Sequence, residues 1–462
     1  MRTRPWWVPL VVFATVLVAQ LVLVAGIGTD IPYQDQWTVE GRQLYPTWID
    51  GTWRLGDLLA AHNEHRIAWT RALDLALFAG NGGHWDPLVQ LAAVAVLRAA
   101  VAAVLAMLLI TLAGFSEWWV MVGIIFAFLP HLAWQNAIWG FQSHVYFSLL
   151  FGIAALALLS SESDESTSPL RKVGGVLAGI AAMLSMGAGL MVPFALLGLV
   201  VVRLIERRRI NWKEMRDAWP VWLLLVVAWG LHGDVSANAE LRALSFKTFF
   251  LAFARATAWP HVWTPIAALG LNFPLLVLIG GRIFGRRESR SGESFFIVLG
   301  GWSAAMALAM AWTRGGSGEF DGGIPSRYAD FLSLLVLANA CAAVALFRSA
   351  TKRRTWARIG GIAWTVFFIA GWAGLSAEVM SRLILPRLRD RDAPVRTMLA
   401  FQRTRDPAVF EGQPLLYVPD GNVVAVGAVL DDPRLRGKLP PSLQPREPLG
   451  PLSRMVRGAL GR

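Results

Sequence analysis

Residues 6–28 read WWVPLVVFATVLVAQLVLVAGIG, a long run without a charged side chain. At about 1.5 Å per residue, a helix of this length crosses a hydrocarbon core of about 30 Å. Because Arg2 and Arg4 precede the run, it could also be a signal peptide cleaved near Ala25. A secretory apolar region is usually about 7 to 15 residues long, so the greater length here favours a retained membrane anchor.

Composition extends this interpretation to the whole chain. Its 462 residues are 55% hydrophobic and 16% charged, whereas about a quarter of the residues of a soluble globular domain are charged. The chain is therefore predicted to be an all-α polytopic membrane protein. Its single cysteine, Cys341, excludes an internal disulfide and a thiolate metal cluster, and we expect it to be a small apolar residue buried in a helix.

The position of the basic residues is more informative than the net charge of +12. Four basic clusters separate apolar runs, at Arg171–Lys172, 203–216, 281–290 and 351–358. Cytoplasmic loops of membrane proteins are enriched in lysine and arginine, so all four clusters are predicted to lie in the cytoplasm.

This placement predicts about eleven transmembrane helices, with the amino terminus inside and the carboxy terminus outside. The expected spans are 6–27, 87–112, 117–133, 143–160, 173–186, 189–203, 217–231, 261–280, 294–312, 328–348 and 359–378. The fifth and sixth are short, and SMGAGLMVP (185–193) has the small residues and proline of a break on the outer side. A single long tilted helix here would instead place the downstream arginine clusters outside.

The outward segments are 28–86, 134–142, 232–260, 313–327 and the tail from 379. In the first, IAWTRALDLALFAG (67–80) has apolar residues at helical spacing but is too short to span, which predicts an amphipathic interfacial helix. We divide the chain into a transmembrane domain (1–378) and an extracytoplasmic segment (379–462). That segment is either a small domain or partly disordered, with a strand-like run at 415–430.

On this topology all seven histidines lie on the outer side, at positions 62, 65, 84, 131, 144, 232 and 261. Histidine exchanges protons near neutral pH and is the commonest metal ligand, so we expect the chemistry on this face. The first outer loop also carries eight carboxylates. Among them Asp35, in IPYQDQW (31–37), would lie near the membrane surface between the aromatic anchors Tyr33 and Trp37. The alternative is an ordinary solvated aspartate.

The stretch AHNEHRIAW (61–69) is unusually polar for this chain. On a helix, His62, His65 and Arg66 would share a face, and Asn63 and Glu64 would point elsewhere. That face could bind a divalent cation, hold a phosphate or acidic substrate, or form a structural cluster. Two imidazoles are too few for a tight metal site. The candidate substrate- or phosphate-binding residues are His62, Glu64, His65 and Arg66.

A second polar segment, WQNAIWGFQSH (134–144), links two spans on the same face. Asn136, Gln142 and His144 could hydrogen-bond a sugar while Trp134 and Trp139 stack on its apolar face. The alternative is an interfacial aromatic belt.

A third segment, TRGGSGEFDGGIPSRYADF (313–331), is a glycine-rich loop in which Arg314 and Arg327 bracket Glu319 and Asp321. At the outer helix end, the Arg327 guanidinium, with Tyr328 beside it, could bind a phosphate through two hydrogen bonds. The alternative is an arginine that merely reaches the lipid headgroups.

Arg98 falls near the middle of the second span, where a charge is costly. It either pairs with a buried acceptor or supports a lipid phosphate.

The segments QDQW, HNEHRI, NAIWGFQSH and PSRYADF are similar, in order and spacing, to segments of a set of bacterial membrane proteins. With its long first outer loop, interfacial helix and about eleven spans, the chain resembles the GT-C superfamily of integral-membrane glycosyltransferases over most of residues 1–350. The resemblance implies inverting transfer of a sugar from a polyprenyl-phosphate donor. The acceptor would be a glycan, glycolipid or protein on the outer face of the bacterial cytoplasmic membrane.

By this resemblance Asp35 is the general base that accepts the proton of the acceptor hydroxyl. Arg327, together with Arg66, would neutralise the departing polyprenyl phosphate. Many members carry two adjacent acidic residues, whereas Asp35 is followed by Gln36, so a divalent cation is an option and not an expectation. The main alternative function is a transporter or flippase of lipid-linked glycans, followed by a non-catalytic partner in envelope assembly. Against a transporter, ionisable residues are scarce at the midplane.

Overall fold

The computed structural model describes residues 6–63, 65–160, 168–208, 212–232, 236–285, 292–316, 323–349 and 354–462. It is 77% helical, as the all-α prediction requires. A helix lies at each predicted span: α1 (Trp7–Ile27), α5 (Pro87–Thr111), α6 (Glu117–Ala127), α8 (Ser143–Leu159), α9 (Pro169–Met183), α10 (Val192–Arg207), α12 (Trp219–Leu231), α14 (Ala267–Ile283), α15 (Glu293–Arg314), α16 (Ala329–Ser349) and α17 (Arg354–Val379).

Within the described ranges, eight helices are long and apolar enough to cross a membrane. Two more, α12 and α14, are apolar but shorter. Length and composition therefore support a multi-pass membrane protein, and the total of about eleven spans stays a prediction.

The packing of α1 follows from its sequence. Its buried side chains recur about every four residues, a spacing that places them on one face; they are Val8, Val12, Val16, Gln20, Val24 and Ile27. This face lies against α5, and the exposed face presents Leu10, Val18 and Val22. Such an apolar exposed face is suited to lipid.

The chain reverses between α9 and α10, as the sequence predicted. The turn is η4 (Gly187–Met191), in which a Cβ on Gly189 would come within 2.1 Å of the Ala182 carbonyl oxygen. Arg171 at the start of α9 and Arg203 near the end of α10 both donate to carbonyls at the end of α8. The two helices are therefore antiparallel, which excludes a single long tilted helix.

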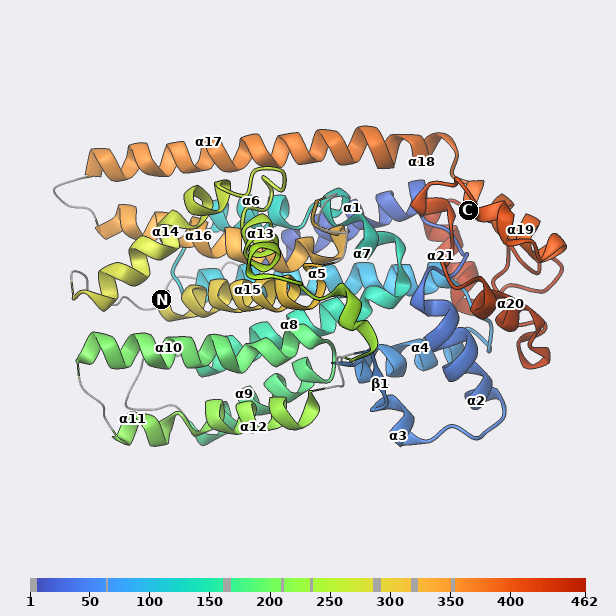
Figure 1. The fold of residues 1–462 in the computed structure, drawn as a ribbon, viewed down its shortest axis with the longest axis horizontal. Coiled ribbons are helices and arrows are strands. Elements are labelled where there is room, and N and C mark those ends of the chain that lie inside the picture. The colour runs from blue at the N-terminus through green and yellow to red at the C-terminus, as the bar shows by residue number, and fades with distance from the viewer. Residues whose placement is uncertain are drawn as a thin grey trace.

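The helix ends that carry the described parts of the four basic clusters, namely the start of α9, the end of α10, α11 (Trp212–Asp217), the end of α14 and the start of α17, lie toward one end of the bundle, on the left in Figure 1. There Arg282 forms an ion pair with Glu206 at 2.8 Å, and Arg348 donates to the Gly114 carbonyl. This distribution is typical of a cytoplasmic face, and the orientation in the membrane stays a prediction.

The opposite end carries what we call the cap, defined as residues 28–86 and 380–462 (Figure 1, right). Its first part contains η1 (Trp37–Leu44), α2 (Tyr45–Ile49), α3 (Leu55–Leu58), β1 (Ala61–His62), β2 (His65–Arg66) and α4 (Ala68–Gly80). Its second part contains η8 (Met380–Ile384), α18 (Leu385–Arg389), α19 (Ala393–Thr404), η9 (Pro407–Phe410), η10 (Leu415–Tyr417), α20 (Val423–Asp431), η11 (Pro433–Leu435) and α21 (Pro451–Leu460). The helix predicted at 67–80 is α4.

The two parts of the cap share one hydrophobic core, which includes Trp37, Tyr45, Phe78 and Trp85 from the first part and Met398, Phe401, Val426 and Leu435 from the second. The Tyr45 and Phe78 rings stack at 4.3 Å. Ion pairs add to this contact, with Arg457 joined to Asp30 and Asp86 at 2.8 and 3.2 Å. The C-terminal segment is thus folded against the first loop.

The strand predicted at 415–430 is wrong, because this run contains η10 and α20. The Asn422 side chain accepts the Ala425 N–H at 3.1 Å and caps α20. Ala425, Val426 and Val429 then form a buried face at helical spacing against η1. A helix forms its backbone hydrogen bonds within the segment, whereas a strand would have needed a second strand to pair with.

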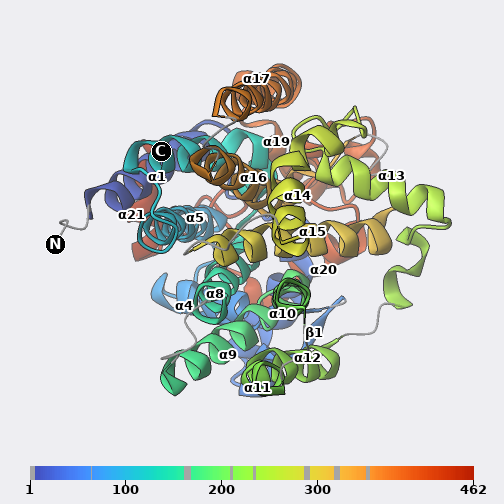
Figure 2. The same ribbon diagram turned by 90° about the vertical axis from the view of Figure 1, so that its left-hand side faces the viewer.

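Short elements connect the long helices: η2 (Pro130–Ala133), α7 (Trp134–Ile138), η3 (Gly140–Gln142), α11 (Trp212–Asp217), η5 (Ser236–Leu241), α13 (Phe246–Thr257) and η7 (Ser326–Tyr328). Figure 2 shows α17 at the edge of the bundle. It also shows α13 lying crosswise at another side of the bundle. Cys341 is buried in α16, as predicted.

Candidate functional site

Asp35 is carried by the turn that joins α1 to η1. Gln34 there has a φ of 52°, a left-handed conformation uncommon outside glycine. Its N–H donates to the Pro419 carbonyl at 2.6 Å, and the Gln36 side chain accepts the Tyr33 N–H at 3.0 Å. The turn is held from both sides, while the Asp35 side chain stays 39% exposed.

The HNEHR stretch forms a tight hairpin, and its predicted helix is wrong. β1 and β2 pair antiparallel with His62 opposite His65, and Asn63 at the turn has a φ of 49°. Opposite residues of such a pair share a face, so the two imidazoles stay together at a ring separation of 6.1 Å. Arg66 falls on the other face. Glu64 lies outside the described residues.

Arg66 donates to two backbone carbonyls. Its Nε bonds to the Leu59 oxygen at 3.1 Å and its Nη1 to the Leu231 oxygen at 2.7 Å. Leu231 ends α12, so Arg66 fastens the hairpin to the bundle. The predicted anion-facing surface shared by Arg66 and the two histidines is therefore not formed.

His62 lies beside Asp35, with its Nε2 3.8 Å from the carboxylate Oδ2. His65 lies deeper in the protein. Burial, followed by the neighbouring imidazoles of His144 and His62, lowers the pKa of His65 well below its usual value. His65 is therefore neutral near pH 7 and adds no positive charge for binding an anion.

An aromatic cluster packs beneath the hairpin. The Phe141 ring lies 5.2 Å from that of His62 and 4.9 Å from that of His144. The Trp139 ring meets that of Tyr33 edge-on at 5.7 Å. The structure thus brings His144 and Trp139 next to the hairpin, although 134–144 and 61–66 are far apart in sequence.

Asn136 and Gln142 are buried and do not face water. The Asn136 Nδ2 donates to Asp330 Oδ2 at 3.0 Å and to the Arg327 carbonyl at 3.1 Å. The Asn136 Oδ1, Gln142 Oε1 and Trp139 Nε1 atoms have no hydrogen-bond partner within the described part of the chain. In this structure the two amides therefore belong to the protein interior.

Arg327 is half-buried in η7, where its Cζ lies 5.0 Å from the centre of the Tyr328 ring. Its charge is close enough to act on Tyr33 and His144, which places it on the Asp35 side of the cluster. Burial raises the pKa of Tyr33 to about 12, and Arg327 partly offsets that rise. Glu319 and Asp321 lie outside the described residues.

Asp420, from the second part of the cap, is a second carboxylate beside Asp35. Burial, and to a smaller extent the charge of Asp35, raise the pKa of Asp420 to about 6, and a hydrogen bond from the Asn422 N–H opposes this. We did not single out Asp420 from sequence. Its only local signal is the turn sequence PDGN (419–422), which gives no hint of its distant neighbour.

A pair of buried acids, Glu40 on η1 and Asp74 on α4, lies deeper in the cap. The Gln90 Nε2 atom donates to both acids, to Glu40 Oε2 and to Asp74 Oδ1, each at 2.8 Å. Gln36 joins the pair by donating to Gln90 at 2.8 Å and to Glu40 at 3.3 Å. Burial raises the pKa of both acids, that of Asp74 to about 7.

Arg98 is fully buried in the bundle and pairs with Asp330 at 2.7 Å. It also donates to Gln20 at 2.9 Å, and Tyr146 donates to Asp330 at 2.7 Å. Of the two sequence interpretations, the structure supports a buried acceptor.

Three of the seven histidines, His62, His65 and His144, converge near Asp35. Other histidines lie elsewhere, for example His131 against Ser376 and His261 against the Phe367 carbonyl. Within the described ranges, no group of three or more His, Cys, Asp or Glu side chains is arranged to hold a metal ion.

Fold and site together define a multi-pass helical membrane protein with a partly exposed carboxylate among histidines at its capped end. No protein-family model matches the chain, and no curated protein or solved structure matches it. The resemblance to GT-C enzymes therefore rests on the sequence segments alone.

Proposed function

We propose that this chain is an inverting glycosyltransferase of the bacterial cytoplasmic membrane. It moves a sugar from a polyprenyl-phosphate donor to a hydroxyl of an envelope glycan, glycolipid or protein on the extracytoplasmic face. The observation that carries the proposal is the Asp35 carboxylate, which stays exposed on a turn fixed close to the end of α1, 3.8 Å from His62.

In the proposed reaction, Asp35 takes the proton of the acceptor hydroxyl as the acceptor oxygen attacks the anomeric carbon. A new carbon–oxygen bond forms on one face of the sugar, and the bond to the phosphate oxygen breaks on the other. The leaving polyprenyl phosphate keeps the electron pair, and Arg327 offsets its charge. His62 is placed to pass the proton from Asp35 to water.

Among the other neighbours of Asp35, Trp139 and Phe141 are almost fully buried, so their ring faces are covered by the protein itself and the support for binding comes from Asp420. Asp420, with its raised pKa, provides a second carboxyl group that can hydrogen-bond an acceptor in its protonated form.

The test of this function is mass spectrometry of surface glycans and glycolipids from cells that lack the protein. We expect one sugar to be missing and to return when the intact chain is supplied. An unchanged set of glycans and glycolipids would contradict the proposal.

A transporter of lipid-linked glycans would also remove a sugar, so a second assay separates the two functions. Membrane vesicles that lack the protein receive the sugar donor on the extracytoplasmic leaflet. Loss of a transferase still prevents transfer there, whereas loss of a flippase does not. The feature that favoured a pathway, Arg98, is already paired with Asp330.

A further inference from the structure

Arg387, on α18, is buried at the junction of the cap and the bundle, with only 2% of the residue exposed. Its Nη1 donates to the Asp390 carbonyl at 2.7 Å, and its guanidinium lies 5.7 Å from the centre of the Tyr417 ring. Its Nη2 is buried without a hydrogen-bond partner in the described chain. One donor of a buried cation is therefore left open.

The charge of Arg387 is not neutralised by an ion pair within the described residues. Asp390 and Asp392 lie near enough to attract it, but neither carboxylate reaches ion-pair distance. Both Asp390 oxygens instead accept from Arg396 at 2.7 Å. Arg462 adds a second positive charge nearby.

The buried arginines of the bundle are different. Arg98 pairs with Asp330, and Arg282 pairs with Glu206. A buried charge without a counter-charge is costly, usually by several kcal/mol. Arg387 therefore indicates a place where an anion from outside the chain is expected.

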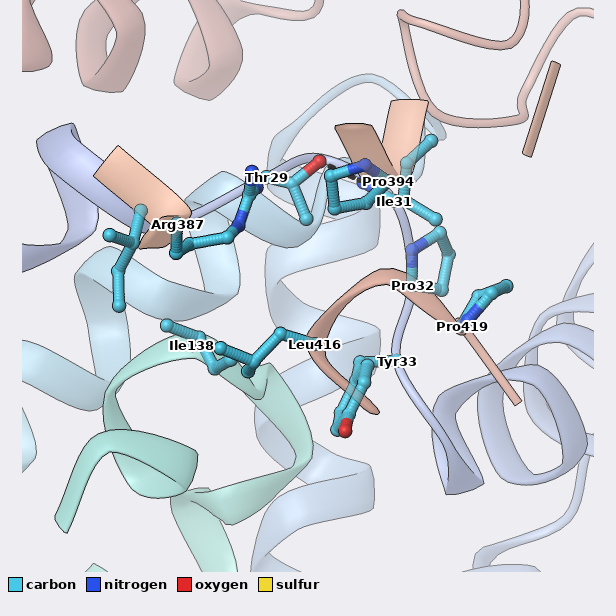
Figure 3. Close-up of a pocket in the computed structure, with 10 residues that line it drawn as sticks. Thr29, Ile31, Pro32, Tyr33, Ile138, Arg387, Pro394, Leu416 and Pro419 are labelled. Atoms are coloured by element: carbon cyan, nitrogen blue, oxygen red, sulfur yellow. Dashed lines mark hydrogen bonds between the residues drawn. The ribbon is translucent and has the colours of Figure 1, made fainter. Parts of the chain in front are cut away.

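A small hollow, part of it open to solvent, lies beside Arg387. Its walls are mostly apolar and include Ile27, Ile31, Ile138 and Leu416. In Figure 3 the Arg387 side chain extends toward Thr29, with Ile138 and Leu416 lying nearby. The hollow therefore combines one cationic group with an apolar lining.

The position of this hollow relative to the membrane follows from the two helices that meet there. α1 ends at Ile27, which is part of the wall. The continuous helix Thr355–Arg389 has 35 residues and, at about 1.5 Å each, exceeds a hydrocarbon core of about 30 Å. Arg387 lies beyond the length of this helix that the core requires and beside Ile27 at the end of the predicted first span, so it lies on the headgroup side of the hydrocarbon core.

We propose that this hollow, the Arg387 pocket, binds the phosphate ester of a membrane lipid. The open Nη2 donates to a phosphate oxygen, because the guanidinium is suited to charge-assisted bonds with phosphate. The apolar walls contact the first carbons of the lipid chain. A free phosphate would leave these walls uncovered. This inference does not depend on the proposed function.

The test is titration of lipid into the purified, delipidated full chain in detergent, read by native mass spectrometry. The probes are dioleoyl phosphatidylglycerol, a polyprenyl phosphate and inorganic phosphate. We expect Arg387→Gln to weaken lipid binding about 10- to 100-fold, since a hydrogen bond to a charged group is worth about 1.5–3 kcal/mol. Arg389→Gln, an exposed arginine on the same helix, is the matched control and should bind as the natural chain does.

Each outcome decides a part of the proposal. Equal lipid affinity in the Arg387→Gln and Arg389→Gln variants would overturn it. Inorganic phosphate that binds as tightly as the lipids would show a free-anion site and overturn the lipid assignment. The preferred lipid identifies the source of the phosphate. If Arg387→Gln does not fold, Leu416→Trp, which narrows the hollow and keeps the guanidinium, must lower lipid binding and leave inorganic phosphate unaffected.

Discussion

Asp35 and Glu40 are carboxylic acids of the same loop that lie in very different surroundings. Asp35 is 39% exposed on a turn beside His62. Glu40 is fully buried, bonded to two glutamine side chains and close to a second acid, Asp74. The comparison teaches that the number of acids in a loop says little about chemistry, because burial decides which of them can exchange a proton with a substrate.

A change of pH should affect the buried acids most strongly. The pKa of Asp74 is raised to about 7 in the folded chain and is near 3.9 when unfolded. As pH rises, the unfolded chain therefore releases this proton at a lower pH than the folded chain does. The free energy of unfolding falls as pH rises from about 4 to about 7. At about 1.4 kcal/mol per pKa unit the loss is up to about 4 kcal/mol, and the raised pKa of Glu40 acts in the same direction.

Asp74→Asn, which resembles the protonated acid, should weaken this pH dependence. The measurement is the apparent Tm in detergent, followed by tryptophan fluorescence from pH 4.5 to pH 7.5. Parallel curves for the natural chain and the variant would show that Asp74 keeps no proton in the folded state.

The second prediction concerns the amide between the two buried acids. Gln90→Leu removes the donor to Glu40 and Asp74 and the acceptor for Gln36. Each buried group left unpaired costs about 1–3 kcal/mol, so the apparent Tm should fall by several degrees. Gln43→Leu, at an exposed position of η1, is the control and should have little effect. A similar small change in both variants would mean that the bridge contributes little.

The third prediction tests how closely the 134–144 segment packs against Gln36 of the cap and Gln90 of α5. A Cβ on Gly140 would lie 2.7 Å from the Gln90 Cβ and 3.1 Å from the Gln36 Nε2. Gly140→Ala should therefore destabilise the chain by about 1–3 kcal/mol. Gly421→Ala, where nothing lies within 4 Å of the new Cβ, should be close to neutral. Thermal unfolding of the two variants, measured side by side, tests this difference in stability.

The smallest effect is expected on the outside of the cap. Arg434 bridges Asp50 in the first part to Asp432 in the second, and its side chain is 41% exposed. Exposed ion pairs contribute about 0–1 kcal/mol, so Arg434→Gln should shift the apparent Tm only slightly. A loss as large as that of Gln90→Leu would show that the two parts of the cap depend on this bridge more than on their shared core.

Most of the fold could be predicted from the sequence. Long apolar runs require helices because backbone groups must be satisfied internally in lipid, and the glycines at 185–193 indicated the reversal between α9 and α10. The 415–430 run was mistaken for a strand because valine-rich segments favour strands unless a cap such as Asn422 begins a helix. Contacts between the first loop and the C-terminal segment join residues far apart in the chain, and no local pattern encodes them.

The candidate site was predictable in part. The clustering of His62 and His65 was readable in sequence, whereas Trp37, expected as an aromatic anchor at the membrane surface, is fully buried in the core of the cap. Helical spacing placed Arg66 on the wrong face, because no local pattern indicates a turn with Asn63 in a left-handed conformation. Asp420 escaped notice because only the folded cap brings it to Asp35.

The central claim is that Asp35 is the general base, and the most direct measurement compares two near-isosteric changes in the same loop. Cells that lack the protein are supplied with the natural chain, Asp35→Asn or Glu40→Gln at matched membrane levels, and transfer of the missing sugar is measured by mass spectrometry. We expect Asp35→Asn to lower the transfer rate by about 10²- to 10⁴-fold without loss of folded protein, and Glu40→Gln to retain most activity. Undiminished transfer by a normally inserted Asp35→Asn variant would contradict the account.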